Sequence, residues 1–149
     1  MYAPDTWTPL PDPVAQPEFY DGVPTKRLLA WVVDVAIILV ATVLVLPFTA
    51  FTGLFFFAPL MMVVSFFYRW ATLATGSATW GMRLMSIEIR QADGSRLGAA
   101  MALMHTTGYA LSVAFFLAQC ASMVLMLSTE RKQGLTDHAL GTVALNRAG

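Results

Sequence analysis

Charged residues are scarce in this chain. Lys, Arg, Asp and Glu make up only 12% of its 149 residues, and nine basic side chains balance nine acidic ones. An average soluble domain is about 25% charged. The lack of net positive charge argues against a nucleic-acid-binding protein. The apolar fraction of 57% excludes a soluble disordered protein. An unusually apolar globule and a membrane protein remain.

Side chains that bind metals or attack substrates are also few. The chain has one cysteine, Cys120, and two histidines, which allow neither an internal disulfide nor a Cys/His metal cluster. The sequence offers no Ser–His–Asp arrangement, glycine-rich phosphate loop or pair of catalytic carboxylates. We therefore expect a protein that is not an enzyme and that uses neither a metal nor another cofactor.

What the sequence does contain is long apolar runs. The first, residues 28–46, is closed by Pro47. Nineteen residues of α-helix span about 28 Å, close to the roughly 30 Å of a bilayer's hydrocarbon core. Thirteen of the nineteen are Leu, Ile or Val, and their favourable insertion energy outweighs the cost of the one acid, Asp34. This run predicts a transmembrane helix.

Two further apolar runs follow. Residues 52–72 predict a second transmembrane helix, in which we expect a kink at Pro59. Residues 98–128 contain no charge, and a single helix over them would be about 46 Å long, much longer than the hydrocarbon core. This third run is either one long tilted helix or a broken, partly re-entrant one, with the break at residues 105–108.

The rest of the chain is polar. Residues 1–27 contain six of the eight prolines and predict an extended, solvated tail. Residues 87–90 lie in the loop 73–97, and residues 142–146 lie in the polar tail 129–149; both are strand-like. Two lone strands are marginal unless they pair, so their mutual pairing would place the loop and the tail on one side. The alternative is two unrelated loop segments.

The basic residues predict the orientation. The turn between the first two runs has no cation, and all nine lie elsewhere: Lys26, Arg27, Arg69, Arg83, Arg90, Arg96, Arg131, Lys132 and Arg147. By the positive-inside rule, the amino terminus and the loop 73–97 face the cytoplasm. We favour a cytoplasmic carboxyl tail too, and therefore a third run that does not cross once. The prediction is an all-α, multi-pass inner-membrane protein with short strand-like cytoplasmic pieces.

Asp34 is the most informative single residue, because an ionisable group inside a membrane span is costly to bury and needs a partner. In a hairpin of the first two helices it lies near the depth of Arg69, which we expect to be its partner, with Arg83 and His105 as alternatives. Arg27 lies two turns earlier on the same face and would reach Asp34 only by bending back or through a water. Asp34 either titrates or coordinates an ion, or it forms a structural ion pair.

Three segments together resemble a known family. An arginine opens the first helix, which also contains Asp34; the second segment is Ser77–Ile87, and the third is Leu135–Val143 with Asp137. Over residues 22–147 the chain resembles the bacterial RDD family of membrane proteins, named for one arginine and two aspartates. The resemblance implies an integral membrane protein of undefined activity, with ion handling or transport suspected for some members. It makes Arg27, Asp34 and Asp137 candidate functional residues.

Two functions fit these observations. The first is ion or solute transport, which requires a homo-oligomer or a larger membrane complex, because three helices hardly enclose a path. The second is a non-catalytic accessory or assembly subunit of such a complex. Small residues in the third run suit close helix packing in either case. The expected partners are therefore the lipid bilayer and other membrane helices, and not nucleic acid.

Overall fold

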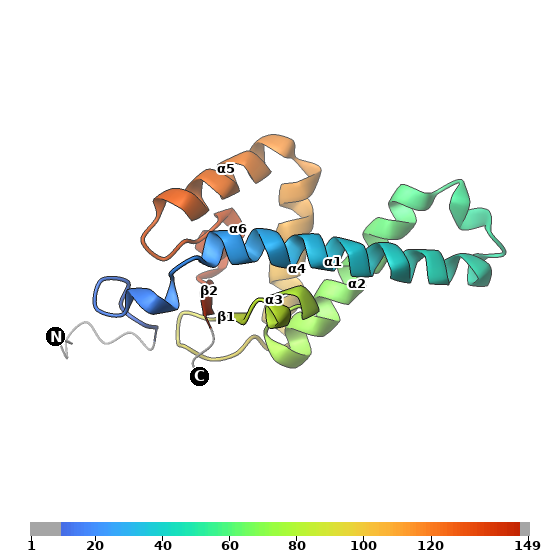
Figure 1. The fold of residues 1–149 in the computed structure, drawn as a ribbon. Coiled ribbons are helices and arrows are strands. Elements are labelled where there is room, and N and C mark those ends of the chain that lie inside the picture. The colour runs from blue at the N-terminus through green and yellow to red at the C-terminus, as the bar shows by residue number, and fades with distance from the viewer. Residues whose placement is uncertain (1–9, 147–149) are drawn as a thin grey trace.

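Two long helices form a hairpin, and the elements that precede and follow it in the chain gather around its open end (Figure 1). The structure is a computed structural model that describes residues 10–146. The elements in chain order are η2 (Pro17–Phe19), α1 (Val23–Val45), η3 (Leu46–Thr49), η4 (Thr52–Leu54), α2 (Phe57–Gly76), α3 (Trp80–Leu84), β1 (Ile87–Arg90), α4 (Ala99–Ala114), α5 (Phe116–Ser128), α6 (Leu135–Leu140) and β2 (Val143–Asn146).

The buried face of α1 determines what packs against it. Four of its buried residues are spaced by four, namely Ala30, Asp34, Ile38 and Thr42, and this spacing places them on one side of a helix. That side contacts α2 and α3. Large apolar side chains on the other sides of α1 are exposed, namely Leu28, Leu29, Trp31, Val32, Leu39, Val40, Val43 and Leu44. Among the described residues, α1 and α2 are both long and apolar enough to cross a membrane, which confirms the two predicted spans.

The connection between α1 and α2 differs in detail from the prediction. Residues 46–54 form two short 3-10 turns, and α2 begins at Phe57 and ends at Gly76. Pro59 is therefore in the first turn of α2, where its missing N–H removes no helical hydrogen bond. The prediction of a kink at Pro59 is wrong, because Pro59 lies at the beginning of the helix and not in its interior.

The third apolar run is broken. The chain bends by 115° between α4 and α5. Phe115, which lies between them, is extended, with φ −109° and ψ 99°. The break lies at Phe115 and not at residues 105–108, where His105 and Thr106 are buried within α4. Of the two alternatives, the broken helix is correct. Helix α5 turns back toward the end of the molecule where α1 begins (Figure 1).

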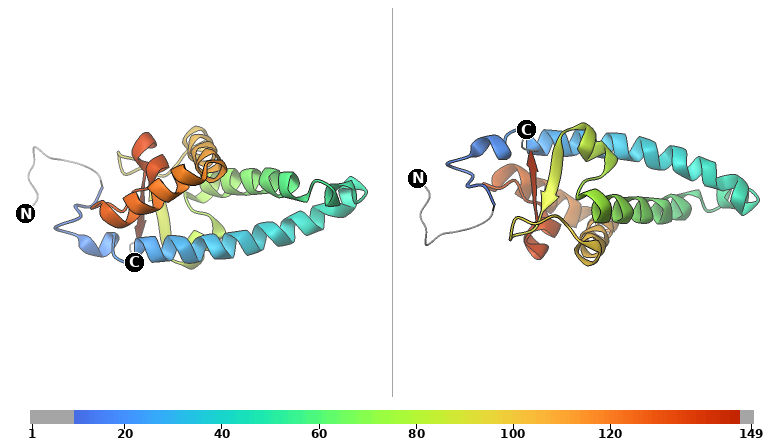
Figure 2. Two further views of the ribbon diagram at one scale, coloured as in Figure 1. Left: turned by 90° about the horizontal axis from the view of Figure 1, so that it is seen from above. Right: turned by 90° about the horizontal axis from the view of Figure 1, so that it is seen from below.

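The two strand-like segments pair with each other, and they are not the two unrelated loop segments that the sequence left as the alternative. Strands β1 and β2 are antiparallel, with Ile87 opposite Asn146 and Arg90 opposite Val143. The sheet lies beside the first turn of α1, where the Lys26 Nζ donates a hydrogen bond of 2.7 Å to the Asn146 Oδ1. The start of α1, strand β1 of the loop 73–97 and strand β2 thus lie together at one end of the molecule (Figure 2).

The segment before α1 is packed in part, which corrects the prediction of a solvated tail at Leu10 and Tyr20, while residues 14–18 are exposed as that prediction expected. Tyr20 is only 2% exposed, and it packs with Leu10, Val143 and Leu145. The Tyr20 hydroxyl donates to the Pro11 carbonyl at 2.7 Å. The reason is that β2 has a second apolar face, and these aromatic and aliphatic side chains cover it. The predictions for residues 1–9 lie outside the described part of the chain.

Candidate functional site

Asp34 is buried among hydrogen-bond donors between α1, α2 and α3. Its carboxylate is 1% exposed. The Tyr68 hydroxyl donates to Oδ1 at 2.6 Å, the Thr79 hydroxyl donates to Oδ2 at 2.6 Å, and the Gly81 amide donates to Oδ1 at 2.9 Å. We call these four residues the Asp34 site. All three donors are uncharged, and none of the ion pairs formed within residues 10–146 includes Asp34.

The short helix α3 presents two of these donors. Thr79 is its N-cap, and the Thr79 hydroxyl accepts a hydrogen bond of 3.2 Å from the Met82 amide while donating its own proton to Asp34. Gly81 approaches α1 so closely that a Cβ would overlap the Ala30 carbonyl oxygen. Only glycine allows this approach, and the approach brings the Gly81 amide to the carboxylate.

A second buried aspartate lies at the polar end of the molecule. Asp137 on α6 is fully buried. The Arg27 Nη1 lies 2.5 Å from its Oδ2, and the His105 Nε2 lies 3.0 Å from its Oδ1. The Thr142 hydroxyl donates to Oδ1 at 2.8 Å, and the Gly134 amide donates to Oδ2 at 3.1 Å. We call this set the Asp137 cluster. It joins α1, α4, α6 and the start of β2.

The charges around Asp137 keep it ionised. Burial by itself raises the pKa of Asp137. The charge of Arg27 and the hydrogen bond with His105 lower this pKa, and together they outweigh the effect of burial. The net pKa of Asp137 is well below the ordinary value of an aspartate. Asp137 thus lies beside its own cation, whereas the groups that contact the Asp34 carboxylate are neutral donors.

Comparison with known families identifies the chain. The model of the RDD family matches residues 22–141, which include Arg27, Asp34 and Asp137. The chain belongs to the RDD family. Together with its two apolar helices, this membership makes it a multi-pass membrane protein. No curated protein and no solved structure matches the chain.

The expected partners of Asp34 in this RDD protein lie elsewhere, so that prediction is wrong. The Arg69 guanidinium lies over the Tyr109 ring. Arg83 donates to the carbonyls of Ala78 and Thr72, and His105 contacts Asp137. The physical reason is that hydroxyl and amide donors of α2 and α3 already contact the carboxylate, and they occupy the positions that a guanidinium or an imidazole would need.

Sequence reasoning missed Tyr68, Thr79 and Gly81 as partners of Asp34. Charge matching searches for cations, and all three groups are neutral. One signal was available for Thr79, because a threonine directly before a short helical segment is a typical N-cap. Sequence reasoning also missed the ion pair between Arg27 and Asp137. The family resemblance gave these two residues only as separate candidates.

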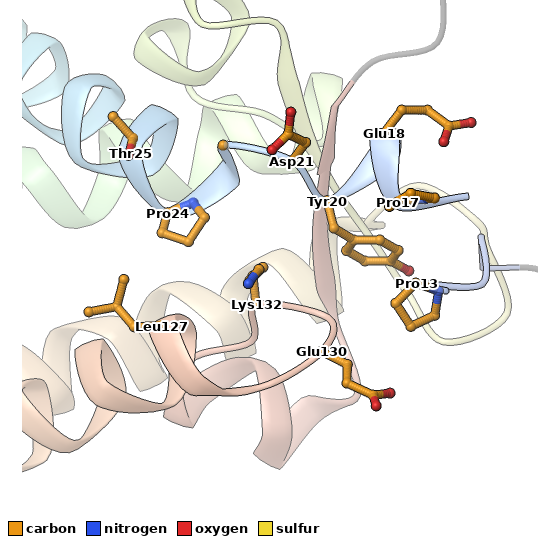
Figure 3. Close-up of a pocket in the computed structure, with 11 residues that line it drawn as sticks. Pro13, Pro17, Glu18, Tyr20, Asp21, Pro24, Thr25, Leu127, Glu130 and Lys132 are labelled. Carbon is orange, nitrogen blue, oxygen red and sulfur yellow. The ribbon is translucent and has the colours of Figure 1, made fainter. Parts of the chain in front are cut away.

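A surface hollow of about 630 Å³ lies apart from both aspartates (Figure 3). It is open, and eight residues between positions 13 and 25 line one side of it, while Leu127, Glu130 and Lys132 line the other. No member of the Asp34 site or of the Asp137 cluster lines it. The buried carboxylates, and not this hollow, are therefore the candidate functional groups of the RDD protein.

Proposed function

We propose that this RDD protein handles ions in the membrane, and that Asp34 is the group that holds a proton or a small cation. The supporting observation is that Asp34 is buried although none of its hydrogen-bond partners carries a charge. A carboxylate inside an apolar helix pair is unfavourable without a counter-charge. The three neutral donors at 2.6–2.9 Å satisfy its oxygens but do not neutralise it. A proton or a cation would do so.

Arg27 and Asp137 have a positioning role in this proposal. Arg27 lies seven residues before Asp34 on α1, but Asp137 already neutralises it at 2.5 Å. It therefore supplies no counter-charge to Asp34. Its ion pair instead fixes the polar end of α1 against α6 and α4, and so holds the helix that contains Asp34.

The proposal requires an assembly. A hairpin and one bent pair of helices cannot enclose a path for an ion, since transport sites lie between several packed helices. We propose a homo-oligomer or a larger complex in the inner membrane. The positive-inside rule favours a cytoplasmic location for the sheet end of the molecule, where Lys26, Arg83, Arg90 and Arg96 lie.

Ion flux into proteoliposomes tests the proposal. Purified wild-type protein should move protons or a monovalent cation, while Asp34→Asn, which keeps the size of the side chain and removes its charge, should show the flux of empty liposomes. Asp34→Ala should behave in the same way. Asp93→Asn is the matched control, because it removes an exposed carboxylate from a loop, and it should keep wild-type flux. Normal flux through a stably folded Asp34→Ala would contradict the proposal.

The second candidate function is a non-catalytic accessory subunit. Strongly exposed apolar side chains around the α4–α5 bend favour it, namely Leu111, Phe115, Phe116, Leu117 and Val124, because such a surface suits either lipid or a partner helix. This function predicts a membrane protein that co-purifies in fixed ratio, with no flux by the isolated chain. In both functions the protein is not an enzyme.

A further inference from the structure

The three hydrogen-bond donors of Asp34 differ in how far they reach the surface. Thr79 is 0% exposed and Gly81 is buried, so these two lie in the interior. Tyr68 on α2 is partly exposed. Its ring lies at 87° to the ring of Trp80, with the ring centroids 5.8 Å apart, and Trp80 is 54% exposed. Within the Asp34 site, Tyr68 is therefore the residue that connects the carboxylate to the surface.

Trp80 indicates which surface this is. It is the first residue of α3, which follows the second span and packs against α1. Tryptophan and tyrosine are enriched where a membrane meets water, and the cations of the loop 73–97 favour its cytoplasmic side. This position favours an interfacial location for the Tyr68–Trp80 pair, where water can reach the exposed side of the tyrosine.

The contacts of the Asp34 carboxylate suit a proton better than a metal ion. Its three partners all direct hydrogens at its oxygens, whereas a metal cation is bound by oxygen lone pairs. No group of three or more His, Cys, Asp or Glu side chains that could hold a metal lies within residues 10–146. Each cation of α1, α2 and α3 contacts another group, and these cations are Lys26, Arg27, Arg69 and Arg83. A proton needs only the hydrogen bond that Tyr68 already makes.

We propose that the Tyr68 hydroxyl is the proton relay of Asp34. The 2.6 Å between this hydroxyl and the Asp34 Oδ1 is within the reach of direct proton transfer. The Tyr68 O–H bond breaks as an Oδ1–H bond forms, and a hydronium ion on the exposed side gives one proton to the phenol oxygen and becomes water. One proton is thereby added to Asp34, the tyrosine is unchanged, and release follows the reverse steps. The relay rests on the proposed function, because it serves an Asp34 that takes up a proton.

Infrared spectroscopy of the reconstituted protein tests the relay. The C=O stretch of protonated Asp34, which is the band that Asp34→Asn removes, shifts when deuterium replaces its proton. The rate of this shift after mixing with heavy water measures proton exchange at Asp34. Tyr68→Phe removes the hydroxyl and keeps the ring against Trp80. It should slow the exchange by about a hundredfold or more, the contribution typical of a positioned proton donor.

Thr79→Val is the matched control. It also removes one neutral hydroxyl donor from the same carboxylate, but this donor is buried. Both variants should change the pH at which Asp34 is half protonated, since each removes one hydrogen bond from the carboxylate. Only Tyr68→Phe should slow the exchange. The comparison separates the role of Tyr68 as a relay from its role as a donor.

A second measurement needs no variant. When the Asp34 Oδ1 carries the proton, Tyr68 changes from donor to acceptor of their hydrogen bond. In wild-type protein labelled with ring-13C tyrosine, a tyrosine C–O stretch should therefore shift together with the Asp34 C=O band. This measurement decides the question should Tyr68→Phe fail to fold.

Three results would overturn the relay alone. They are wild-type exchange in Tyr68→Phe, an equal slowing in Thr79→Val, and a tyrosine C–O stretch that stays fixed while Asp34 takes up its proton. In each of them Asp34 still binds a proton, so the proposed function stands. A wild-type Asp34 that never takes up a proton would overturn the relay, and one that responds to neither pH nor an added cation would overturn the proposed function as well.

Discussion

The guanidinium of Arg27 lies 2.5 Å from the carboxylate of Asp137, which is 110 residues later in the chain. Two candidate functional residues from opposite ends of the domain thus form one ion pair. The pair leaves Asp34 without a cation, although Asp34 and Arg27 lie two turns apart on α1. Arg27 contacts Asp137 and not Asp34, so Asp137 has an arginine as its partner and Asp34 does not.

Removal of Asp137 should destabilise the fold strongly. Asp137→Ala leaves the partly buried Arg27 and the buried His105 without their common anion, and loss of one partner from a buried pair costs about 3–5 kcal/mol. Thermal unfolding in detergent measures the loss. The double variant Arg27→Ala/Asp137→Ala should lose less stability than the two single changes together. Strict additivity would show that the ion pair has no energetic coupling.

Asp137 should also make stability depend on pH. Its pKa is lowered in the folded protein, so its ionised form stabilises the fold above the unfolded value of about 3.9. That contribution is lost as the pH falls below about 4 toward the folded pKa. The gap in thermal midpoint between wild type and Asp137→Asn should therefore narrow between about pH 5 and about pH 3. A gap that stays constant over this range would contradict the assignment.

A single added methyl group at Gly81 should disturb the Asp34 site. In Gly81→Ala the new Cβ overlaps the Ala30 carbonyl and lies 2.8 Å from the Asp34 Oδ1, so α3 must move away from α1. Overpacking of this kind costs about 1–3 kcal/mol. Gly98→Ala is the matched control, because its Cβ would meet nothing within 4 Å. Equal stability of the two variants would exclude the close contact between α3 and α1.

The sheet predicts which segments share a side of the membrane. In a Cys120→Ser background, Ser95→Cys and Glu130→Cys should react with an impermeant maleimide from the same side, because β1 pairs with β2. Thr52→Cys, in the α1–α2 connection, should react from the opposite side. Labelling of position 130 together with position 52 would show that the bent α4–α5 pair makes one complete crossing.

The sequence predicted those parts of the fold that depend on local patterns of apolar and polar residues. The two spans follow from runs of Leu, Ile and Val. For β1 and β2 the sequence indicated two short strand-like segments that are stable only together, and it left open whether they pair. The break at Phe115 could not be located, since neither proline nor glycine lies at that position. The packing of Tyr20 could not be foreseen either, because it depends on an apolar face of β2 that exists only in the folded protein.

The candidate site shows the same limit more sharply. Asp34 is recognisable because one acid stands out in an apolar run. Its partners are not, because hydroxyls and a backbone amide carry no such contrast in the sequence. The match between Arg27 and Asp137 required the position of α6, a helix of six residues whose place is determined by tertiary contacts with α4 and α5.

The most direct measurement of the central claim is the protonation of Asp34 itself in lipid. Infrared difference spectroscopy of the reconstituted protein reports the C=O stretch of a protonated carboxylic acid. A band that Asp34→Asn removes and Asp93→Asn retains should change when the pH or the concentration of a small cation is varied. An Asp34 whose protonation does not respond to pH or to any added cation, in a folded membrane-embedded protein, would show that it is a fixed structural group and would contradict ion handling at this site.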